Sequence, residues 1–318
     1  MLAGELDPRL NLLKSLDIPA CRVEYLQAPI VLLCGGKVKS KTTPEGLDPQ
    51  VKSLRHAITK LHTEYEVFRP EEIDSWQSDA IFKDLMRFEL ELAAICSLVV
   101  IILESEGAIA ELGAFSQVPE LSEKIIAICP EEFRNANSFI NLGILRFIAA
   151  KNDSNVKSYP WTPDKEKFVV SDEVVGDVCA DIQEELDKLP KSQLLKVGHD
   201  SHVMVLISEL LRFFSALKES EISQYLAILG VEISIDSLRG KLFLLREFQL
   251  IKMQGYGGSD FYLSGKKSYH TLRLSILGLS KPTDLLRIQT ECLEYYQNNS
   301  QHRNRLRAIS QANAGAGR

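Results

Sequence analysis

Short, nearly continuous apolar runs recur along the first half of the chain and predict buried β-strands. The clearest run, 97–103, holds six consecutive apolar residues and has the length of a strand rather than of a helix. A strand that is apolar on both faces is typical of the centre of a parallel sheet. Four further runs predict neighbouring strands, at 28–36, 66–70, 124–129 and 156–161.

Segments with apolar residues at helical spacing separate these strands. This spacing predicts helices at 5–17, 50–64, 79–96, 108–117 and 172–189, and a helix or ordered turn at 138–150. Residues 37–49 are rich in Lys, Pro and Gly, which predicts a loop. The alternation predicts an α/β fold with a doubly wound, mostly parallel sheet, and such sheets bind ligands beyond the carboxyl ends of their strands.

The second half of the chain has a different pattern. Three predicted helices, 203–217, 221–229 and 235–248, precede a hairpin at 250–263 with a glycine-rich tip. This order is typical of a winged helix-turn-helix. After Ser300 the chain is polar and basic and ends in an Ala-Gly run, which predicts a disordered tail. We therefore expect an α/β domain over 1–190, a winged-helix-like domain over 191–290 and a tail over 291–318.

The charge differs in sign between the two halves of the 318-residue chain. Residues 1–190 contain 20 Lys and Arg against 32 Asp and Glu, whereas residues 191–318 contain 17 against 11. The net charge of −6 conceals this asymmetry. The basic half is the natural candidate for a polyanionic partner, although a chance segregation of solvated charges gives the same pattern.

Composition excludes several classes of protein. Apolar residues make up 45% of the chain, yet no run approaches the ~18 residues of a membrane span, and charges interrupt any signal-peptide pattern near the start. The six cysteines form no CxxC pair, the histidines form no HExxH motif, and no GxSxG elbow is present. We expect a cytoplasmic protein with reduced cysteines, no metal site and no membrane partner.

The most specific motif is ESEGAIAELGAFS at 104–116. It places Glu111 in the first turn of the helix expected from Ala108, at the carboxyl end of the central strand. A helix N-terminus favours an ionised carboxylate by ~0.3–1 kcal/mol, which suits an acidic nucleophile. Ala108 stands where a capping box requires Ser or Thr, so capping does not account for Glu111. Glu104 and Glu106 add carboxylates at the same corner. We take Glu104 as a second catalytic candidate, although simple solvation explains it equally well.

Other polar or small residues near the strand ends are candidates for holding a sugar, base or phosphate. Cys34, Gly35 and Gly36 allow close backbone approach but form neither a P-loop nor a GxGxxG motif. Arg69 and Glu71 flank a proline at a strand end, where a surface ion pair gives the same pattern. The remaining substrate-binding candidates are Ser105, Gly107, Ser116 and Asn141.

Cations of the winged-helix-like domain are candidates for contacts with phosphates. Arg239 and Arg246 lie seven residues apart, on the helix face away from the leucines. Lys241, Lys266 and Lys267 complete this nucleic-acid-binding set. An ordinary solvated helix face, or a winged helix that docks protein, has the same composition.

Four ordered motifs resemble those of the effector proteins of bacterial retrons. They are LLCGG at 32–36, VIILES at 100–105, ELGAFS at 111–116 and SFINLG at 138–143. The resemblance covers most of 28–165 and, more loosely, 200–280. In those effectors a nucleoside deoxyribosyltransferase-like domain precedes a winged-helix-like domain, so the resemblance implies that 1–190 is the catalytic domain.

The resemblance also implies an antiphage toxin–antitoxin system. The toxic effector would be restrained by a retron reverse transcriptase and its branched RNA–DNA product, the msDNA. Deoxyribosyltransferases attack the C1′ of a sugar with a glutamate, a role that maps onto Glu111, whereas Glu104 only approximates their acidic base-recognition residue. The resemblance therefore favours an N-glycosidase that cleaves NAD or another nucleotide or nucleoside, with NAD as a substrate and no cofactor. A homo-oligomer or filament is implied in the same way.

The chemistry agrees with this interpretation. When a base leaves C1′, positive charge builds on the sugar, and a neighbouring carboxylate stabilises that charge or captures it covalently, as in retaining glycosidases. The alternative is a catalytically inert nucleotide-sensing domain fused to a DNA-binding winged helix, which would be a regulator.

Overall fold

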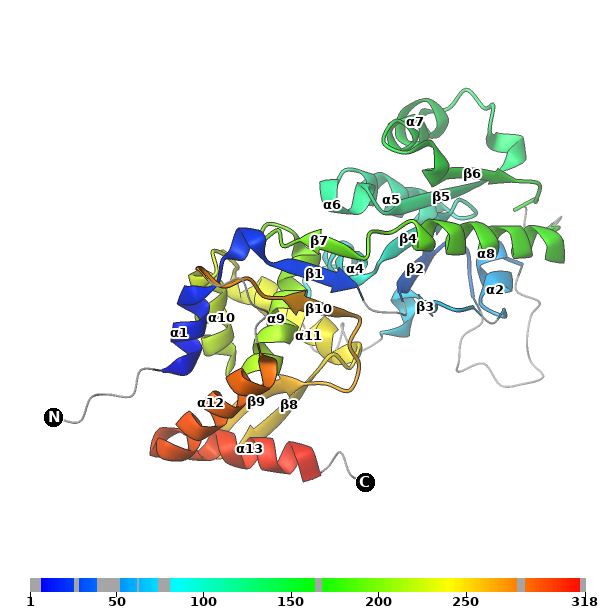
Figure 1. Cartoon of the computed structure of the whole chain (residues 1–318). Helices are drawn as coiled ribbons and strands as arrows, with labels where there is room; N and C mark the ends of the chain where they lie inside the picture. Colours follow the sequence, from blue (N-terminus) through cyan, green and yellow to red (C-terminus); the bar gives the residue numbers. More distant parts are fainter. Residues whose placement is uncertain are drawn as a thin grey trace, which may run out of the picture. The chain divides into compact units, whose positions relative to one another are not determined.

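The structure is a computed structural model that describes residues 7–25, 29–38, 52–61, 63–73, 81–163, 168–278 and 284–314 (Figure 1). Two compact units divide the chain. The sheet unit consists of Ala28–Asp74 and Leu92–Leu189, and the helical unit of Met1–Gln27, Ser75–Glu91 and Pro190–Arg318. The stretch that the sequence predicts as one domain over 1–190 thus contributes two segments to the helical unit.

Five parallel strands form the core of the sheet unit, in the order β3-β2-β4-β5-β6. Every residue of β2, β4 and β5 is buried, as their continuously apolar sequences require. The predicted α/β fold with a parallel sheet is confirmed. The strands are β2 (Ile30–Cys34), β3 (Glu66–Phe68), β4 (Leu98–Ile102), β5 (Ile125–Pro130) and β6 (Val156–Tyr159).

Helices cover both faces of this sheet (Figure 1). Alternate strand residues such as Leu33 and Val100 pack with apolar residues of α2 (Leu54–Ile58) and α8 (Asp172–Asp187). The helix α5 (Glu106–Ser116) follows β4 and packs against β4 and β5. Because all five strands are parallel, their carboxyl ends share one edge, and the segments that follow β2, β3 and β4 meet there.

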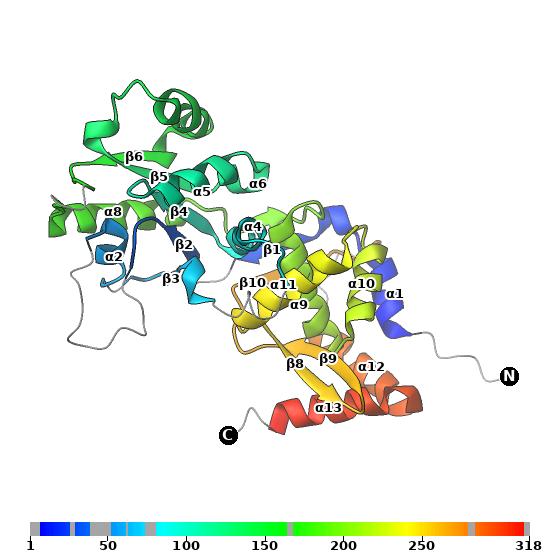
Figure 2. The same cartoon turned by 180° about the vertical axis from the view of Figure 1, so that it is seen from behind.

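The helical unit contains three helices followed by an antiparallel hairpin (Figure 2). These elements are α9 (Asp200–Phe214), α10 (Glu219–Ile228), α11 (Ile235–Glu247), β8 (Ile251–Tyr256) and β9 (Ser259–Ser264). This unit also has a three-stranded antiparallel sheet, which the hydrophobic pattern of the chain does not predict. It pairs β1 (Arg22–Tyr25) with β7 (Ser192–Leu194) on one side and with β10 (His270–Arg273) on the other. The helix α1 (Pro8–Ser15) precedes β1.

The predicted disordered tail is helical instead. The helices α12 (Leu285–Asn298) and α13 (Arg303–Ala314) occupy most of it, while residues 315–318 lie outside the described part. Small residues of α13, Ala308 and Ala312, are buried against Phe261 and Leu263 of β9. The tail is therefore helical because its few apolar side chains, although small, lie on one face of α13 and pack against the hairpin.

Several predicted helices have different limits. Within the described residues, the predicted helix at 50–64 is observed as α2, and the predicted helix at 79–96 as α4 (Leu85–Ile95). Residues 138–150 form a π-helix, Ile140–Leu145, that continues into α7 (Arg146–Ala149). Most of the predicted loop 37–49 lies outside the described residues. None of the helices in the described ranges combines the length and the apolar run that a membrane span requires.

Candidate active site

Glu104 accepts four hydrogen bonds from described residues at the carboxyl end of β4. Its Oε1 accepts from the backbone N–H groups of Gly36 and Arg55, each at 3.0 Å, and from the Ser53 hydroxyl at 2.8 Å. Its Oε2 accepts from the backbone N–H of Leu54 at 2.7 Å. The carboxylate thus holds the start of α2 and the turn after β2 against the end of β4. These contacts give Glu104 a positioning task, and its catalytic role stays a prediction.

Glycine is favoured in the turn after β2 because Glu104 lies so close. A Cβ on Gly36 would stand 3.0 Å from Oε1 and Cδ of Glu104. At Gly35, φ is +157° and a Cβ would meet Arg55, Glu104 and Ile102 at 3.2 Å. The glycines therefore bring the backbone to Glu104, whereas Cys34 is fully buried at the end of β2.

Glu111 lies in the second turn of α5, not in the first. The helix begins at Glu106, two residues earlier than predicted, because the Ser105 hydroxyl caps it by accepting the Ala108 N–H at 3.2 Å. Ser105 also donates to the Gly35 carbonyl at 3.1 Å, which joins the start of α5 to the turn after β2. The helix-terminus stabilisation expected for Glu111 is thus largely lost, because it falls off within the first turn.

Glu111 is a half-buried carboxyl with one unsatisfied oxygen. Its Oε2 is buried and has no hydrogen-bond partner among the described residues. Burial raises the pKa of Glu111, while a hydrogen bond from Cys34 and the positive charge of Arg55 oppose the rise and the charge of Glu71 adds to it. A carboxylate held with an unsatisfied oxygen is poised to meet positive charge on a ligand.

Arg55 is the site residue that sequence reasoning missed. Its guanidinium donates to the Leu33 carbonyl at 2.8 Å, the Gly36 carbonyl at 3.2 Å and Glu71 Oε2 at 2.7 Å. The helical pattern of 50–64 gave Arg55 no role, yet the structure buries it. The candidate Arg69 instead pairs with Glu72 at 2.7 Å.

Two predicted substrate-binding side chains hydrogen-bond to backbone carbonyls instead of to the candidate site. The buried Ser116 donates to the Gly113 carbonyl at 3.1 Å, and the Asn141 amide donates to the Ala136 carbonyl at 2.8 Å. Within the described residues, neither side chain hydrogen-bonds to Glu104 or Glu111. Gly107, in contrast, lies in the first turn of α5, where an added Cβ would meet only Ser105 Oγ at 3.9 Å. No three His, Cys, Asp or Glu side chains of the described ranges gather closely enough to hold a metal ion.

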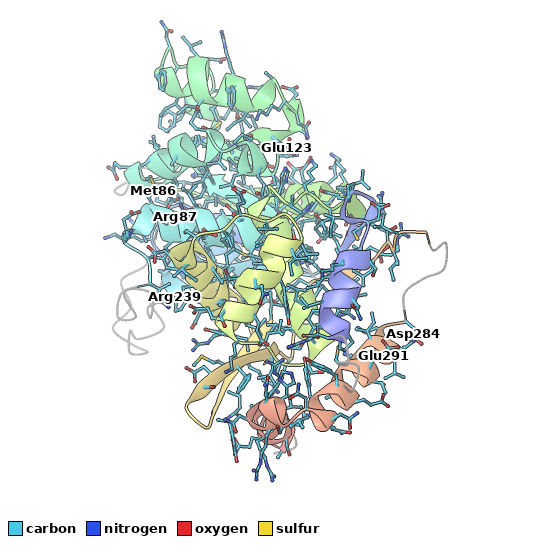
Figure 3. The ribbon with its side chains drawn as sticks, turned by 90° about the vertical axis from the view of Figure 1, so that its left-hand side faces the viewer. Met86, Arg87, Glu123, Arg239, Asp284 and Glu291 are labelled. Atoms are coloured by element: carbon cyan, nitrogen blue, oxygen red, sulfur yellow. The ribbon has the colours of Figure 1, made fainter. Side chains whose placement is uncertain are left out.

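The predicted phosphate-binding cations divide into buried and exposed groups. Lys241 is fully buried and pairs with Glu91 and with Asp200, the latter at 2.7 Å, so it cannot reach a phosphate. Arg239 is exposed at the surface of α11 but pairs with Glu219 at 3.0 Å (Figure 3). Arg246, Lys266 and Lys267 are exposed, and the Lys267 ammonium donates to the Tyr269 hydroxyl at 3.2 Å.

Comparisons with known proteins place the chain in a class of α/β proteins associated with retrons. Residues 51–253 match the model of a family described as STM3845 retron effector protein. This match covers more than half of the chain, which therefore belongs to that family.

Two relatives from Escherichia coli carry related descriptions. The Retron Ec86 putative ribosyltransferase/DNA-binding protein is 29% identical over 130 residues, which is 40% of this chain and 39% of that protein. The Retron Ec73 putative ribosyltransferase/DNA-binding protein is 30% identical over 81 residues, which is 26% of each chain. The matched stretches therefore span less than half of the length of either relative.

Replacing Glu104 by Gln should lower the free energy of unfolding by roughly 2 kcal/mol, since hydrogen bonds to a charged acceptor are lost. The matched control is Glu106→Gln on the exposed first turn of α5, which should cost under about 1 kcal/mol. Chemical denaturation of both variants measures the difference. Equal losses would mean that the Glu104 contacts do not hold the site together.

Replacing Glu111 by Gln should stabilise the protein at neutral pH. Burial raises the folded-state pKa of Glu111. The free energy of unfolding therefore falls as pH rises from the ordinary pKa of 4.5 through the raised folded-state pKa. The gain in Glu111→Gln is therefore full above that window and disappears below it. Thermal unfolding as a function of pH measures it, with exposed Glu123→Gln (Figure 3) as the control. A gain in stability that persists at pH 3, or no gain at any pH, would contradict a raised pKa for the half-buried Glu111 carboxyl.

Proposed function

We propose that this retron effector cleaves an N-glycosidic bond with Glu111 as the nucleophile. The observation that carries the proposal is the Glu111 carboxyl, half-buried at the carboxyl edge of the parallel sheet. One of its oxygens has no hydrogen-bond partner in the described part of the chain. The descriptions of both relatives as putative ribosyltransferases support glycosyl chemistry. A nucleoside deoxyribosyltransferase-like fold for the sheet unit is part of the proposal.

The proposed reaction has two steps at C1′ of the sugar. In the first, the bond from C1′ to the base nitrogen breaks, its electron pair leaves with the base, and an oxygen of Glu111 bonds to C1′. In the second, water attacks C1′, gives up a proton to solvent and releases Glu111. The oxocarbenium-like charge on the sugar is stabilised by the carboxylate throughout.

NAD is the substrate that requires the fewest catalytic groups. Its nicotinamide is cationic when bound and leaves as a neutral base, so no general acid is needed. An ionised Glu111 carboxylate favours a cationic glycoside over a neutral one. We assign sugar contacts to the backbone around Gly35, Gly36 and Gly107.

Purified protein should release base from NAD or from one member of a panel of nucleosides and nucleotides. Chromatography measures the released base. Glu111→Gln should lower the rate by at least about a thousandfold, because loss of a nucleophile removes the covalent route. If the isolated chain is silent, the assay is repeated with the reverse transcriptase and msDNA. Release by Glu111→Gln at the wild-type rate, or silence in both settings, would favour the inert sensor.

The helical unit is proposed to be a winged helix that contacts nucleic acid. Its three helices and hairpin follow the order of that fold, and both relatives are described as putative DNA-binding proteins. Arg246, Lys266 and Lys267 are exposed and supply the phosphate contacts. We propose that msDNA and the reverse transcriptase restrain a toxic activity through this unit, within a homo-oligomer or filament. A regulator with an inert sheet unit would use the same surface.

Combined replacement of Arg246, Lys266 and Lys267 by Ala should weaken binding to duplex DNA and reduce its salt dependence. Each lost phosphate contact lowers the slope of log affinity against log salt by about 0.9. The control is Arg287→Ala, an exposed cation of α12 that pairs with Glu291. Fluorescence anisotropy over a salt series measures both slopes. A triple variant with the wild-type slope would refute this surface.

A further inference from the structure

The last helix of the chain, α13, is a cationic element of the helical unit. It contains Arg303, Arg305 and Arg307, and no Asp or Glu follows Glu294 in the sequence. The composition of this segment predicts a disordered tail, in which such cations would point in no fixed direction. Because the segment is helical instead, each arginine lies on a definite face of α13.

Arg305 faces inward and anchors α13 to the rest of the unit. Its side chain is 4% exposed, and its guanidinium pairs with Glu221 of α10. The same Glu221 oxygen accepts from Arg9 of α1 at 2.9 Å. The guanidinium carbon of Arg305 also lies 4.8 Å from the centre of the Tyr296 ring of α12. Breaking the pair would leave a buried charge without its partner, so these contacts fix the rotation of α13 about its axis.

This anchoring turns Arg303 and Arg307 outward. At 3.6 residues per turn, the positions two before and two after Arg305 lie on nearly the opposite face of the helix, about 6 Å apart along its axis. Both side chains are exposed. Neither forms an ion pair with a carboxylate of the described residues. The outer face of α13 therefore presents two neighbouring cations without a counter-charge.

Other exposed arginines of the helical unit differ because carboxylates neutralise them. The pairs lie at 3.0, 3.5 and 2.7 Å and are Arg239 with Glu219, Arg273 with Glu24, and Arg287 with Glu291. An anion that approaches the outer face of α13 does not have to break an internal ion pair of this kind. This face is consequently a better site for an anionic partner than the paired arginines are.

The two cations lie on a helix that packs along the hairpin β8–β9 (Figure 2). The side-chain amide of Asn304, the neighbour of Arg303, lies against Gly257 at the hairpin tip, where an added Cβ would clash with it. Near the other end of α13, the Ala312 carbonyl accepts from the Lys252 ammonium of β8 at 3.1 Å. The helix and the hairpin thus form one packed element, with Arg303 at the end of α13 that meets the tip.

We propose that Arg303 and Arg307 are a further contact surface for the phosphate backbone of nucleic acid, in addition to the cations around α11. The proposal rests on the proposed function of the helical unit and adds α13 to it. Arginine suits this partner because its guanidinium donates two parallel hydrogen bonds to phosphate oxygens. Contacts with phosphates position a nucleic acid and carry no sequence information. The surface therefore contributes equally to binding of unrelated sequences.

The test is a double variant, Arg303→Ala with Arg307→Ala, in the full-length protein. It should weaken binding to duplex DNA and lower the slope of log affinity against log salt by about 1.8, since each phosphate contact contributes about 0.9. Fluorescence anisotropy over a salt series should give the same reduction for two duplexes of unrelated sequence. Replacement of both arginines by Lys keeps the charges and should keep the slope.

The matched control is Arg287→Ala, which removes an exposed arginine of α12 that pairs with Glu291 and should leave the slope unchanged. Since Arg303 and Arg307 are exposed, the thermal unfolding temperature of the double variant should stay that of the wild type. A slope lowered as much by Arg287→Ala would overturn the proposal, because the effect would then come from net charge.

The outcomes separate this proposal from the proposed function. A wild-type slope in the double variant, beside a lowered slope in the triple variant of Arg246, Lys266 and Lys267, would overturn the role of α13 alone. A lowered slope in the double variant alone would support α13 and refute the other surface. Absence of DNA binding by the wild type would overturn both. If the double variant instead lost self-association and kept the DNA slope, an acidic protein surface would be the partner and the proposal would be wrong.

Discussion

Four donors converge on the carboxylate of Glu104, from the turn after β2 and from the first residues of α2. Without this acceptor the N–H groups of Gly36, Leu54 and Arg55 would be left unpaired at a half-buried edge of the sheet. These hydrogen bonds to Glu104 fix the start of α2 and thereby orient the Arg55 guanidinium. The surroundings of Glu111 therefore depend on a residue that does not itself need to take part in any reaction.

Two carboxylates on the same β4–α5 segment have opposite environments. Glu104 is satisfied by hydrogen bonds. Glu111 has a raised pKa and one buried oxygen that no described residue hydrogen-bonds. A carboxylate whose oxygens accept hydrogen bonds from the protein holds those donors in place. A carboxylate oxygen without such a bond is free to stabilise a cationic transition state. This difference in environment, more than the presence of acidic residues, distinguishes the proposed nucleophile from its neighbour.

The sequence predicts the parallel sheet because runs such as 97–103 are continuously apolar, rich in β-branched residues and only as long as a strand. It also predicts Glu111, whose motif follows the central strand. It does not predict Arg55 or Ser53, since their roles arise from a contact with Glu104 some fifty residues away, which no local pattern encodes.

The errors have local physical causes. The capping hydroxyl of Ser105 starts α5 two residues early, so Glu111 loses the expected help of the helix terminus. The apolar stripe of α13 consists largely of alanines, which is too weak a signal to oppose the polar composition of the tail. The sequence predicts Lys241 as a phosphate-binding cation of an amphipathic helix. The side chain is buried instead, and its ion pairs with Glu91 and Asp200 make that burial possible.

Covalent trapping tests the central claim, that Glu111 attacks C1′, most directly. The protein is incubated with a 2′-fluoroarabinosyl nicotinamide N-glycoside, whose fluorine slows release of the sugar from the enzyme, and is then digested and sequenced by mass spectrometry. The account predicts one added sugar on Glu111 and none in Glu111→Gln. A sugar on Glu104, or base release with no residue labelled, would contradict it.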